Sequence, residues 1–100
     1  MKSYVTFMDY FATGEGRTIE LYYCQAKNKK SALKKHLDFF GYKTKEAQDY
    51  FGLDIATYDV DDPKLESVLN AVFKGNSEWI YKVLREAVID FSFKFYFNYS

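Results

Sequence analysis

The sequence predicts an α+β domain with two layers, in which helices pack on one face of a mostly antiparallel four-stranded sheet. Strand-like and helix-like segments follow the order ββααβααβ, which lacks the strict alternation that a parallel sheet requires. The first two strand-like segments are separated only by a short turn rich in glycine. The chain has 100 residues, of which 48% are hydrophobic, and this is enough for one core. Residues 1–100 are therefore predicted to form a single domain.

Four segments have the composition of strands. Residues 3–11 and 18–26 are rich in β-branched and aromatic side chains, and the turn TGEGR between them predicts a hairpin. The segment LDIATYDV, residues 53–60, predicts a third strand. In residues 88–100 an apolar or aromatic side chain returns at every second position from Ile89 to Tyr99, which predicts the last strand.

Four segments have the spacing and the end signals of helices. The first spans 28–41, with Asn28 as N-cap and Gly41 at its end. A short second helix is predicted over 44–52. The third, 61–75, has Pro63 at its first position, and the fourth spans 76–88. Their apolar stripes are Leu33, Leu37 and Phe40 in the first, Leu65, Val68, Leu69, Val72 and Phe73 in the third, and Trp79, Ile80, Val83, Leu84 and Ala87 in the fourth.

Alternation along the strands predicts which side chains share a face of the sheet. One set is expected to pack against the helices: Val5, Phe7, Phe11, Ile19, Leu21, Tyr23 and the row from Ile89 to Phe97. The other set is then expected to face outward: Tyr4, Thr6, Met8, Tyr10, Glu20, Tyr22, Cys24, Ser92, Lys94, Tyr96, Asn98 and, from the third strand, Tyr58. This parity turns Asp9 inward, which requires a bulge or a position at the rim.

The charges are balanced overall but separated along the chain. Lys and Arg number 14, as do Asp and Glu, so no net field attracts nucleic acid or an anionic membrane. Residues 27–45 nevertheless hold seven lysines against one acid, whereas residues 46–66 hold seven acids against one base. Lys30 and Lys34 lie one helical turn apart and are candidate anion-binding residues, although a lysine-rich solvated face explains the same pattern.

Residues that can carry chemistry are few, and we expect no catalytic, metal or cofactor site. Cys24 and His36 are the single cysteine and histidine, and nothing in the sequence supplies a third group to orient them. The acids of 59–66 lack the spacing of a calcium loop and can act as a helix N-terminal cap. The turn TGEGR precedes a strand rather than a helix, so a phosphate-binding loop is not indicated.

The single cysteine also bears on location. It excludes an intramolecular disulfide and is typical of a reducing, cytoplasmic environment. The N-terminal residues have no apolar signal region, and no apolar run approaches the length of a membrane span. We expect a cytoplasmic protein without a membrane partner.

The outward tyrosines predict the working surface. Tyrosine provides contact area and a hydroxyl group at little cost in rotamer entropy, so it is frequent in protein interfaces. The candidate partner-binding residues are Tyr4, Tyr10, Tyr22, Tyr58, Lys94 and Tyr96. The predicted function is a small intracellular module that binds a protein, including one in a nucleic-acid-handling complex, and occludes its surface. The alternatives are a nucleic-acid-binding accessory protein that uses the lysine-rich helix 27–40 and a subunit of an enzyme whose chemistry lies in another chain; the sequence also allows a homodimer.

The overall profile resembles a known type of protein. About 100 residues, one cysteine, abundant Tyr, Phe, Lys and Asn and no active-site motif look like small phage-encoded inhibitors of host defence, such as anti-CRISPR proteins. The resemblance is one of type and assigns no role to any residue. It implies inhibition of a host defence complex by binding to it, and the balanced charge sets this chain apart from the acidic members that mimic DNA.

Overall fold

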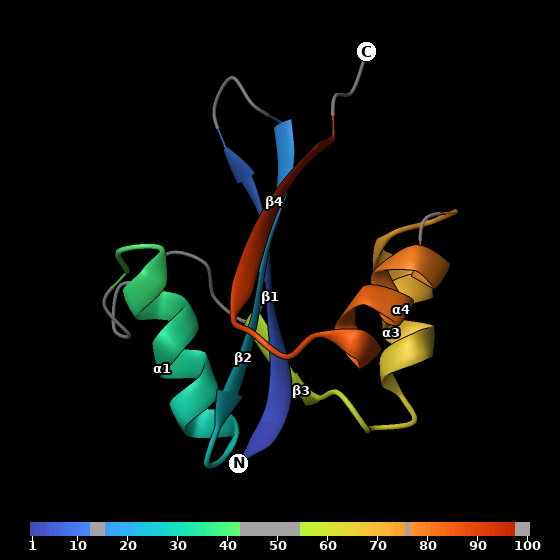
Figure 1. The fold of residues 1–100 in the computed structure, drawn as a ribbon. Helices are drawn as coiled ribbons and strands as arrows, with labels where there is room; N and C mark the ends of the chain where they lie inside the picture. Colours follow the sequence, from blue (N-terminus) through green and yellow to red (C-terminus); the bar gives the residue numbers. More distant parts are fainter. Residues whose placement is uncertain (13–15, 43–54, 76, 98–100) are drawn as a thin grey trace.

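The chain folds around one antiparallel sheet with strand order β3-β1-β2-β4 (Figure 1). The computed structural model describes residues 1–12, 16–42, 55–75 and 77–97. Within them lie β1 (Lys2–Ala12), β2 (Gly16–Ala26), α1 (Lys29–Phe39), β3 (Ile55–Asp59), α3 (Leu65–Val72), α4 (Ser77–Glu86) and β4 (Phe91–Phe97). The predicted α+β class and four-stranded antiparallel sheet are confirmed. The helix predicted over 44–52 lies outside the described residues.

The β1–β2 hairpin forms the centre of the sheet. Its register runs without a break from Lys2 opposite Ala26 to Ala12 opposite Gly16. Gly16, the first residue of β2, has a φ of 78°, a conformation that glycine adopts without steric cost. β3 pairs with the outer side of β1, and β4 pairs with the outer side of β2, so the two short strands form the two edges.

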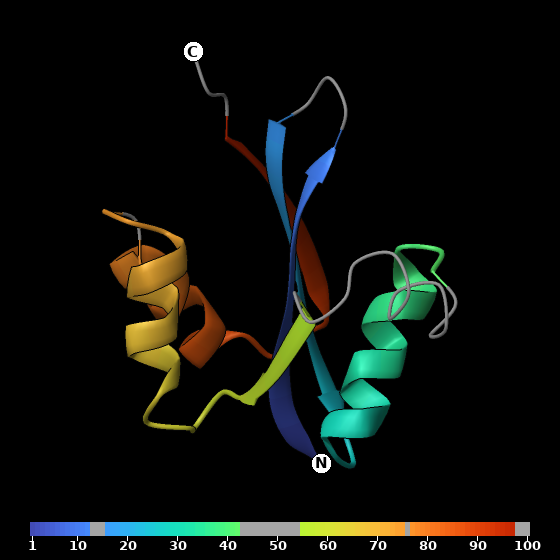
Figure 2. The ribbon, with the colours of Figure 1, turned by 180° about the vertical axis from the view of Figure 1, so that it is seen from behind.

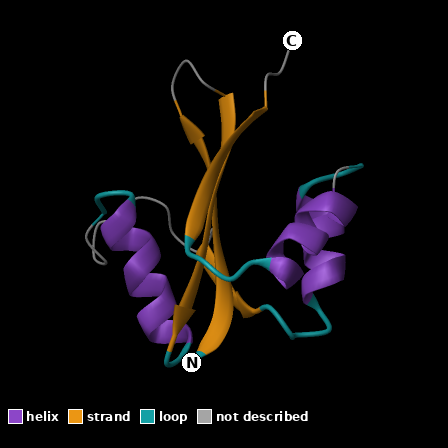
Figure 3. Cartoon of the chain, viewed as in Figure 1, coloured by secondary structure: helices purple, strands orange, loops and turns teal. Residues whose placement is uncertain are grey.

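Helices cover both faces of the sheet, so the prediction that they pack on one face is wrong. Figures 2 and 3 show α1 on one side of the sheet and the α3–α4 pair on the other, which makes three layers. The reason lies in the central strands. Tyr4, Val5, Thr6, Phe7 and Met8 are consecutive in β1 and all buried, so both faces of this strand need cover.

The main core lies between the sheet and the α3–α4 pair. Five of the strand residues expected there are buried together with residues from both helices, and the cluster comprises Val5, Phe7, Ile19, Leu21, Tyr23, Val60, Leu65, Leu69, Phe73, Ile80 and Leu84. Of the expected row in the last strand, Phe91, Phe95 and Phe97 are partly buried against this cluster, and the side chain of Phe11 lies outside the described residues. A smaller cluster under α1 contains Tyr4, Cys24, Ala26 and Ala32. The radius of gyration is 13.1 Å, the value expected for one compact unit of this length.

The helix ends follow the sequence signals in part. Asn28 caps α1, because its side chain accepts a hydrogen bond from the Ser31 backbone N–H at 2.9 Å. α3 begins later than predicted, at Leu65, and Asp62 instead stabilises the turn before it by accepting from the Lys64 N–H at 2.9 Å. In α1 the buried residues are Ala32, His36 and Leu37, so of the predicted stripe only Leu37 is fully buried.

The last strand begins later than its sequence pattern predicts. β4 begins at Phe91, and the preceding Val88 and Ile89 are 78% and 73% exposed. The prediction that Ile89 belongs to the buried row is therefore wrong. The reason is that α4 ends at Glu86, so residues 87–90 are needed to bring the chain from the helix layer back to the sheet.

Asp9 shares the face of Ile19, on the α3–α4 side, without a bulge, and its side chain is 36% exposed, as expected of the predicted rim position. Arg17 of β2 donates from Nε and Nη2 to the Asp9 carboxylate, with a shortest distance of 2.6 Å. The Arg17 guanidinium also lies over the Phe97 ring, 5.4 Å from its centroid. A paired, bidentate arginine thus compensates the charge that the alternation places on this face.

Candidate functional site

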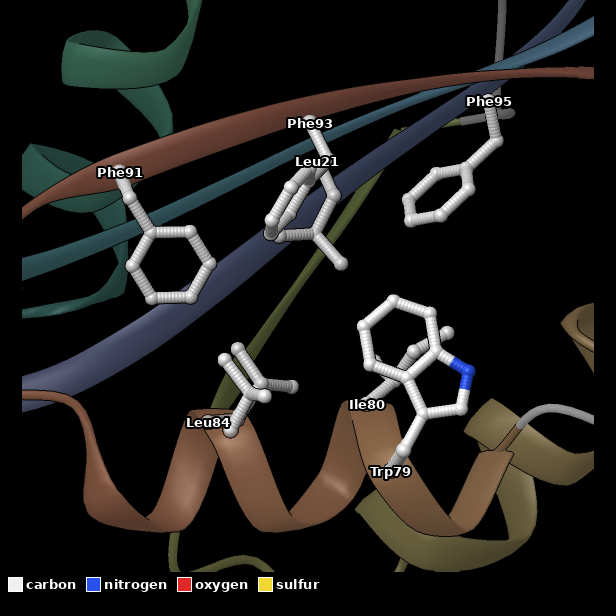
Figure 4. Close-up of a pocket in the computed structure, with 8 residues that line it drawn as sticks. Leu21, Trp79, Ile80, Leu84, Phe91, Phe93 and Phe95 are labelled. Atoms are coloured by element: carbon white, nitrogen blue, oxygen red, sulfur yellow. The ribbon is translucent and has the colours of Figure 1, made fainter.

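An apolar pocket lies between α4 and the edge strand β4 (Figure 4). Its lining consists of Leu21, Trp79, Ile80, Val83, Leu84, Phe91, Phe93 and Phe95. Three of these side chains remain open to solvent: Trp79 is 48% exposed, Phe93 44% and Val83 38%. Large apolar side chains gathered in this way on a surface are typical of an interaction site.

The helical spacing explains why α4 leaves apolar side chains at the surface. Ile80 and Leu84 lie one turn apart and are buried against the sheet. Trp79 and Val83 precede them by one residue each, so they share the neighbouring strip of the helix. The apolar stripe of α4 is therefore wider than the part that the sheet covers, and its remainder lines the pocket.

The phenylalanines of β4 alternate as predicted but are not equally covered. Phe91 stacks on Tyr23 with ring centroids 5.1 Å apart, and Phe95 packs edge-on against Phe73 at 4.8 Å. Phe93 lies between them and contacts its strand neighbours Phe91 and Phe95 at 5.5 and 5.8 Å. Phe91 and Phe95 thus anchor the strand to the core, and Phe93 contributes to the open pocket.

β4 is also a sheet edge. It pairs with β2 from Phe91 opposite Tyr23 to Phe97 opposite Arg17, and in the described part of the chain no strand pairs with its other side. Its seven residues contain no proline, glycine or bulge. Natural proteins commonly protect an edge strand with such features or with charges.

The predicted tyrosine surface does not exist as one open face. Tyr4 is only 5% exposed and lies in the cluster under α1. Tyr22 is half-buried against the Phe39 ring of α1, with centroids 5.0 Å apart. Tyr58 lies on the opposite face, where it packs against Phe7 at 6.2 Å. The prediction failed because α1 folds back over the face that was expected to be free.

The remaining predicted contact residues lie near the β4 edge or in a polar cluster. Tyr96 is 54% exposed, and Lys94 Nζ lies 5.9 Å from its ring centroid. Tyr10 is half-buried and donates a hydrogen bond to Glu20. Of the six predicted contact residues, Lys94 and Tyr96 are exposed and close together, and the other four are buried or half-buried.

A buried polar cluster centred on Glu20 was missed by the sequence reasoning. Glu20 is 1% exposed, and its Oε2 accepts from the hydroxyls of Tyr10 at 2.8 Å and Tyr42 at 3.1 Å. Lys94 Nζ lies 3.7 Å from the same oxygen. His36, which is fully buried, places Nε2 3.7 Å from Glu20 Oε1, beyond hydrogen-bond distance.

This cluster keeps Glu20 ionised. Burial alone would raise the pKa of Glu20, but the surrounding polar groups outweigh burial and hold that pKa below its ordinary value. The pKa is lowered by the neighbouring His36 ring, then by the hydrogen bonds from Tyr10 and Tyr42, and then by the charge of Lys94. Burial and the Glu20 carboxylate in turn raise the pKa of both Tyr10 and Tyr42, so both phenols remain donors at neutral pH.

Cys24 and His36, the pair considered for nucleophilic chemistry, have separate surroundings. Cys24 is buried with Tyr4 and Ala26, and burial raises the pKa of its thiol to about 11. His36 faces Glu20 and the ring of Phe40. The thiol is therefore protonated at neutral pH, whereas a nucleophilic cysteine needs a lowered pKa.

Three of the four acidic residues of 59–66, namely Asp59, Asp61 and Asp62, make structural contacts. Asp59 pairs with Lys2 at 3.5 Å, and Asp61 pairs with Arg85 at 2.9 Å. Among the residues that the structure describes, no group of three or more His, Cys, Asp or Glu side chains is arranged to hold a metal ion. Residues 13–15 of the predicted turn TGEGR lie outside that part of the chain.

The lysines of α1 form the other candidate surface. Lys30 and Lys34 are exposed on the helix, as the spacing predicts. Lys35 donates from Nζ to the Gln25 carbonyl at 2.7 Å, which ties the helix to the end of β2. This surface belongs to the α1 layer and is separated by the sheet from the α4 pocket.

Comparison with known proteins identifies no relative of this chain. No family model matches the chain, and neither a curated protein nor a solved structure is similar to it. Within the described ranges, every helix is too short or too polar to cross a membrane. The functional inference therefore depends on the surfaces described above.

Proposed function

We propose that this chain is a small protein-binding module that occupies a partner's surface through the α4–β4 pocket. The observation that carries the proposal is the gathering of half-exposed Trp79, Val83 and Phe93 beside a sheet edge that has no proline, glycine or bulge. Tryptophan and phenylalanine are typical of the centre of protein interfaces, where they fill a partner's pockets. The proposal keeps the function predicted from the sequence but moves its surface from the tyrosine face to the α4–β4 side.

The electrostatics of this surface favour a protein over a nucleic acid. Lys94 is the only charged residue of β4, and Glu20 lies 3.7 Å from its Nζ. A nucleic-acid strand stacked on aromatic rings needs a positively charged groove beside them. The pocket is too shallow to admit a side chain, but its lining is entirely apolar or aromatic, which suits packing against an apolar protein surface.

The biological setting is part of the same proposal. Inhibition of a host defence complex, as the resemblance to small phage-encoded inhibitors implies, is one use of a module that acts by occlusion. A cytoplasmic setting is supported by Cys24, a free thiol buried in the sheet. The identity of the captured partner, in the experiment below, tests the first statement.

The test is capture from the native cell with the intact chain and two variants of α4. Trp79→Ala removes the most exposed aromatic of the pocket, and Lys82→Ala changes an exposed residue of the same helix outside the pocket lining. We expect a partner, identified by mass spectrometry, that is retained by the wild type and by Lys82→Ala and lost with Trp79→Ala. Loss of an anchor of this kind costs about 2 kcal/mol of binding free energy. A partner retained equally by all three proteins would place the interface elsewhere.

Nucleic-acid binding by α1 remains the second candidate, because Lys30 and Lys34 are exposed one turn apart. Against it, both arginines of the chain are engaged with aspartates: Arg17 with Asp9 and Arg85 with Asp61. Arginine is the more specific phosphate ligand, so the basic surface consists of lysines alone.

A further inference from the structure

The free edge of β4 has properties that favour pairing with another strand. It is seven residues long, its register with β2 is unbroken, and its side chains alternate between phenylalanine and Ser92, Lys94 or Tyr96. Such an edge presents unpaired backbone N–H and C=O groups next to apolar side chains. The other edge, β3, has five residues, none of which is exposed, and ends at Asp59, which pairs with Lys2.

We propose that two copies of this chain pair through β4, antiparallel about a two-fold axis at Phe93, so that each copy masks the other's α4–β4 pocket. This surface is the one assigned above to partner binding, so the dimer rests on that proposed function. In the free protein, the second copy occupies the surface. A binding partner then competes with the second copy.

Symmetry restricts the register of such a pair. A two-fold axis normal to the sheet keeps each side chain on its own face, so phenylalanines of one copy must lie opposite phenylalanines of the other. Centring the axis on Lys94 would place ammonium groups opposite each other, which is destabilising. Centring it on Phe93 places Phe91 opposite Phe95, Ser92 opposite Lys94 and the exposed Ile89 opposite Phe97.

The charges on the edge are compatible with a second copy. Lys94 is the only charged residue in β4, and its Nζ is directed to the buried Glu20 carboxylate of its own chain. Opposite Lys94, the Phe93-centred register places the neutral Ser92, which adds no like charge. An edge lysine repels a strand that brings a like charge opposite it, and the Phe93-centred register brings none.

The exposed apolar area is sufficient for a weak, specific dimer. Trp79, Val83, Val88, Ile89 and Phe93 are between 38% and 78% exposed and lie on β4, on α4 or in the connection between them. Together they expose on the order of 500 Å² of side chain, given the size of such residues. A standard interface buries about 800 Å² per partner, and the backbone edge and Tyr96 supply further contact area.

The experiment combines sedimentation equilibrium with amide hydrogen exchange on the wild-type chain at low and high concentration. We expect a monomer–dimer equilibrium with dimer dominant at about 100 μM, typical of a weak specific interface. Raising the concentration should slow exchange in β4 and leave β3, the other edge, unchanged. A chain that stays monomeric, or a dimer whose β4 amides exchange as in the monomer, would overturn the proposal.

Charge variants at one position test the register. Ser92→Lys places like charges opposite Lys94 twice in the dimer and should weaken it by about tenfold, whereas Ser92→Glu should strengthen it. Ala71→Lys, on the exposed side of α3, adds the same charge away from the edge and should have no effect. Equal effects of the two Ser92 variants would overturn the Phe93-centred pairing.

The two proposals fail in different ways. A monomeric protein whose captured partner is lost with Trp79→Ala would refute the dimer and retain the binding function. A dimer with protected β4 amides, combined with capture that is insensitive to Trp79→Ala, would refute the heterologous function and retain the dimer.

Discussion

Glu20→Gln is expected to destabilise the fold at neutral pH, because the cluster around this side chain is built for a charged acceptor. Its Oε2 accepts from Tyr10 and Tyr42 at 2.8 and 3.1 Å, with Lys94 Nζ at 3.7 Å. Hydrogen bonds to a charged group contribute about 1.5–3 kcal/mol, against about 0.5–1.5 kcal/mol for neutral ones. Glutamine keeps an acceptor and loses the charge. We therefore expect a loss of about 1–3 kcal/mol in the free energy of unfolding.

The pH dependence supplies a sharper test than the magnitude. The pKa of Glu20 is lower in the folded chain than its ordinary value of 4.5, so the folded state binds fewer protons between those two values. The stabilisation is therefore complete above the ordinary pKa and is lost as the pH falls through the folded pKa. The difference between wild type and Glu20→Gln should be largest near neutral pH and shrink below about pH 4.5.

Urea unfolding followed by circular dichroism, at a series of pH values from neutral to acidic, measures this difference. Glu86→Gln is the matched control, because Glu86 is exposed at the end of α4, and it should change stability by less than about 0.5 kcal/mol. Equal stability of wild type and Glu20→Gln at neutral pH would refute the reasoning. So would a difference that grows as the pH falls.

Other predictions concern the core and the two remaining surfaces. Leu69→Ala should cost about 2–5 kcal/mol in urea melts, because Leu69 is completely buried between α3 and the sheet; a cost below about 0.5 kcal/mol would contradict its place there. Tyr4→Ala should lower the free energy of unfolding by about 3–5 kcal/mol, as expected for a buried aromatic side chain. A variant with wild-type stability would show that Tyr4 is a surface residue, as the sequence predicted. If α1 binds nucleic acid, neutralising Lys30 and Lys34 together should reduce the salt dependence of binding, and absence of any binding at low salt would remove that candidate. Cys24 should resist alkylation by iodoacetamide at neutral pH in the native chain and react rapidly in urea, because burial raises its pKa to about 11; fast modification of the native protein would show an open thiol.

Local patterns were sufficient for the elements and for the parity of the strands. Alternation correctly placed Phe7, Leu21 and Tyr23 in one core, because neighbouring side chains of a strand must point to opposite faces. Helix spacing correctly identified Leu69 and Leu84 as buried. These properties depend on residues close to one another in the chain, so they can be predicted from the sequence alone.

The Glu20 cluster shows what local patterns do not contain. Tyr10 belongs to β1, Glu20 to β2, His36 to α1 and Lys94 to β4, and Tyr42 follows α1. A lone glutamate in a strand reads as an outward, solvated side chain, and only the packing of α1 over the sheet buries it. The signal in the sequence was the row of Tyr4, Thr6 and Met8, whose face is too apolar to remain uncovered.

The sequence by itself thus determined which side chains share a face, and the tertiary structure decided which faces are covered. Periodicity defines an apolar stripe on each helix or strand. Which element packs against that stripe depends on how the chain connects the elements and on which other apolar faces compete for the same packing position. α1 covers the tyrosine face because both sides of β1 and β2 are apolar, and the sheet has only two sides on which helices can pack. α4 then covers only part of β4, which leaves Trp79 and Phe93 exposed at the edge of the sheet.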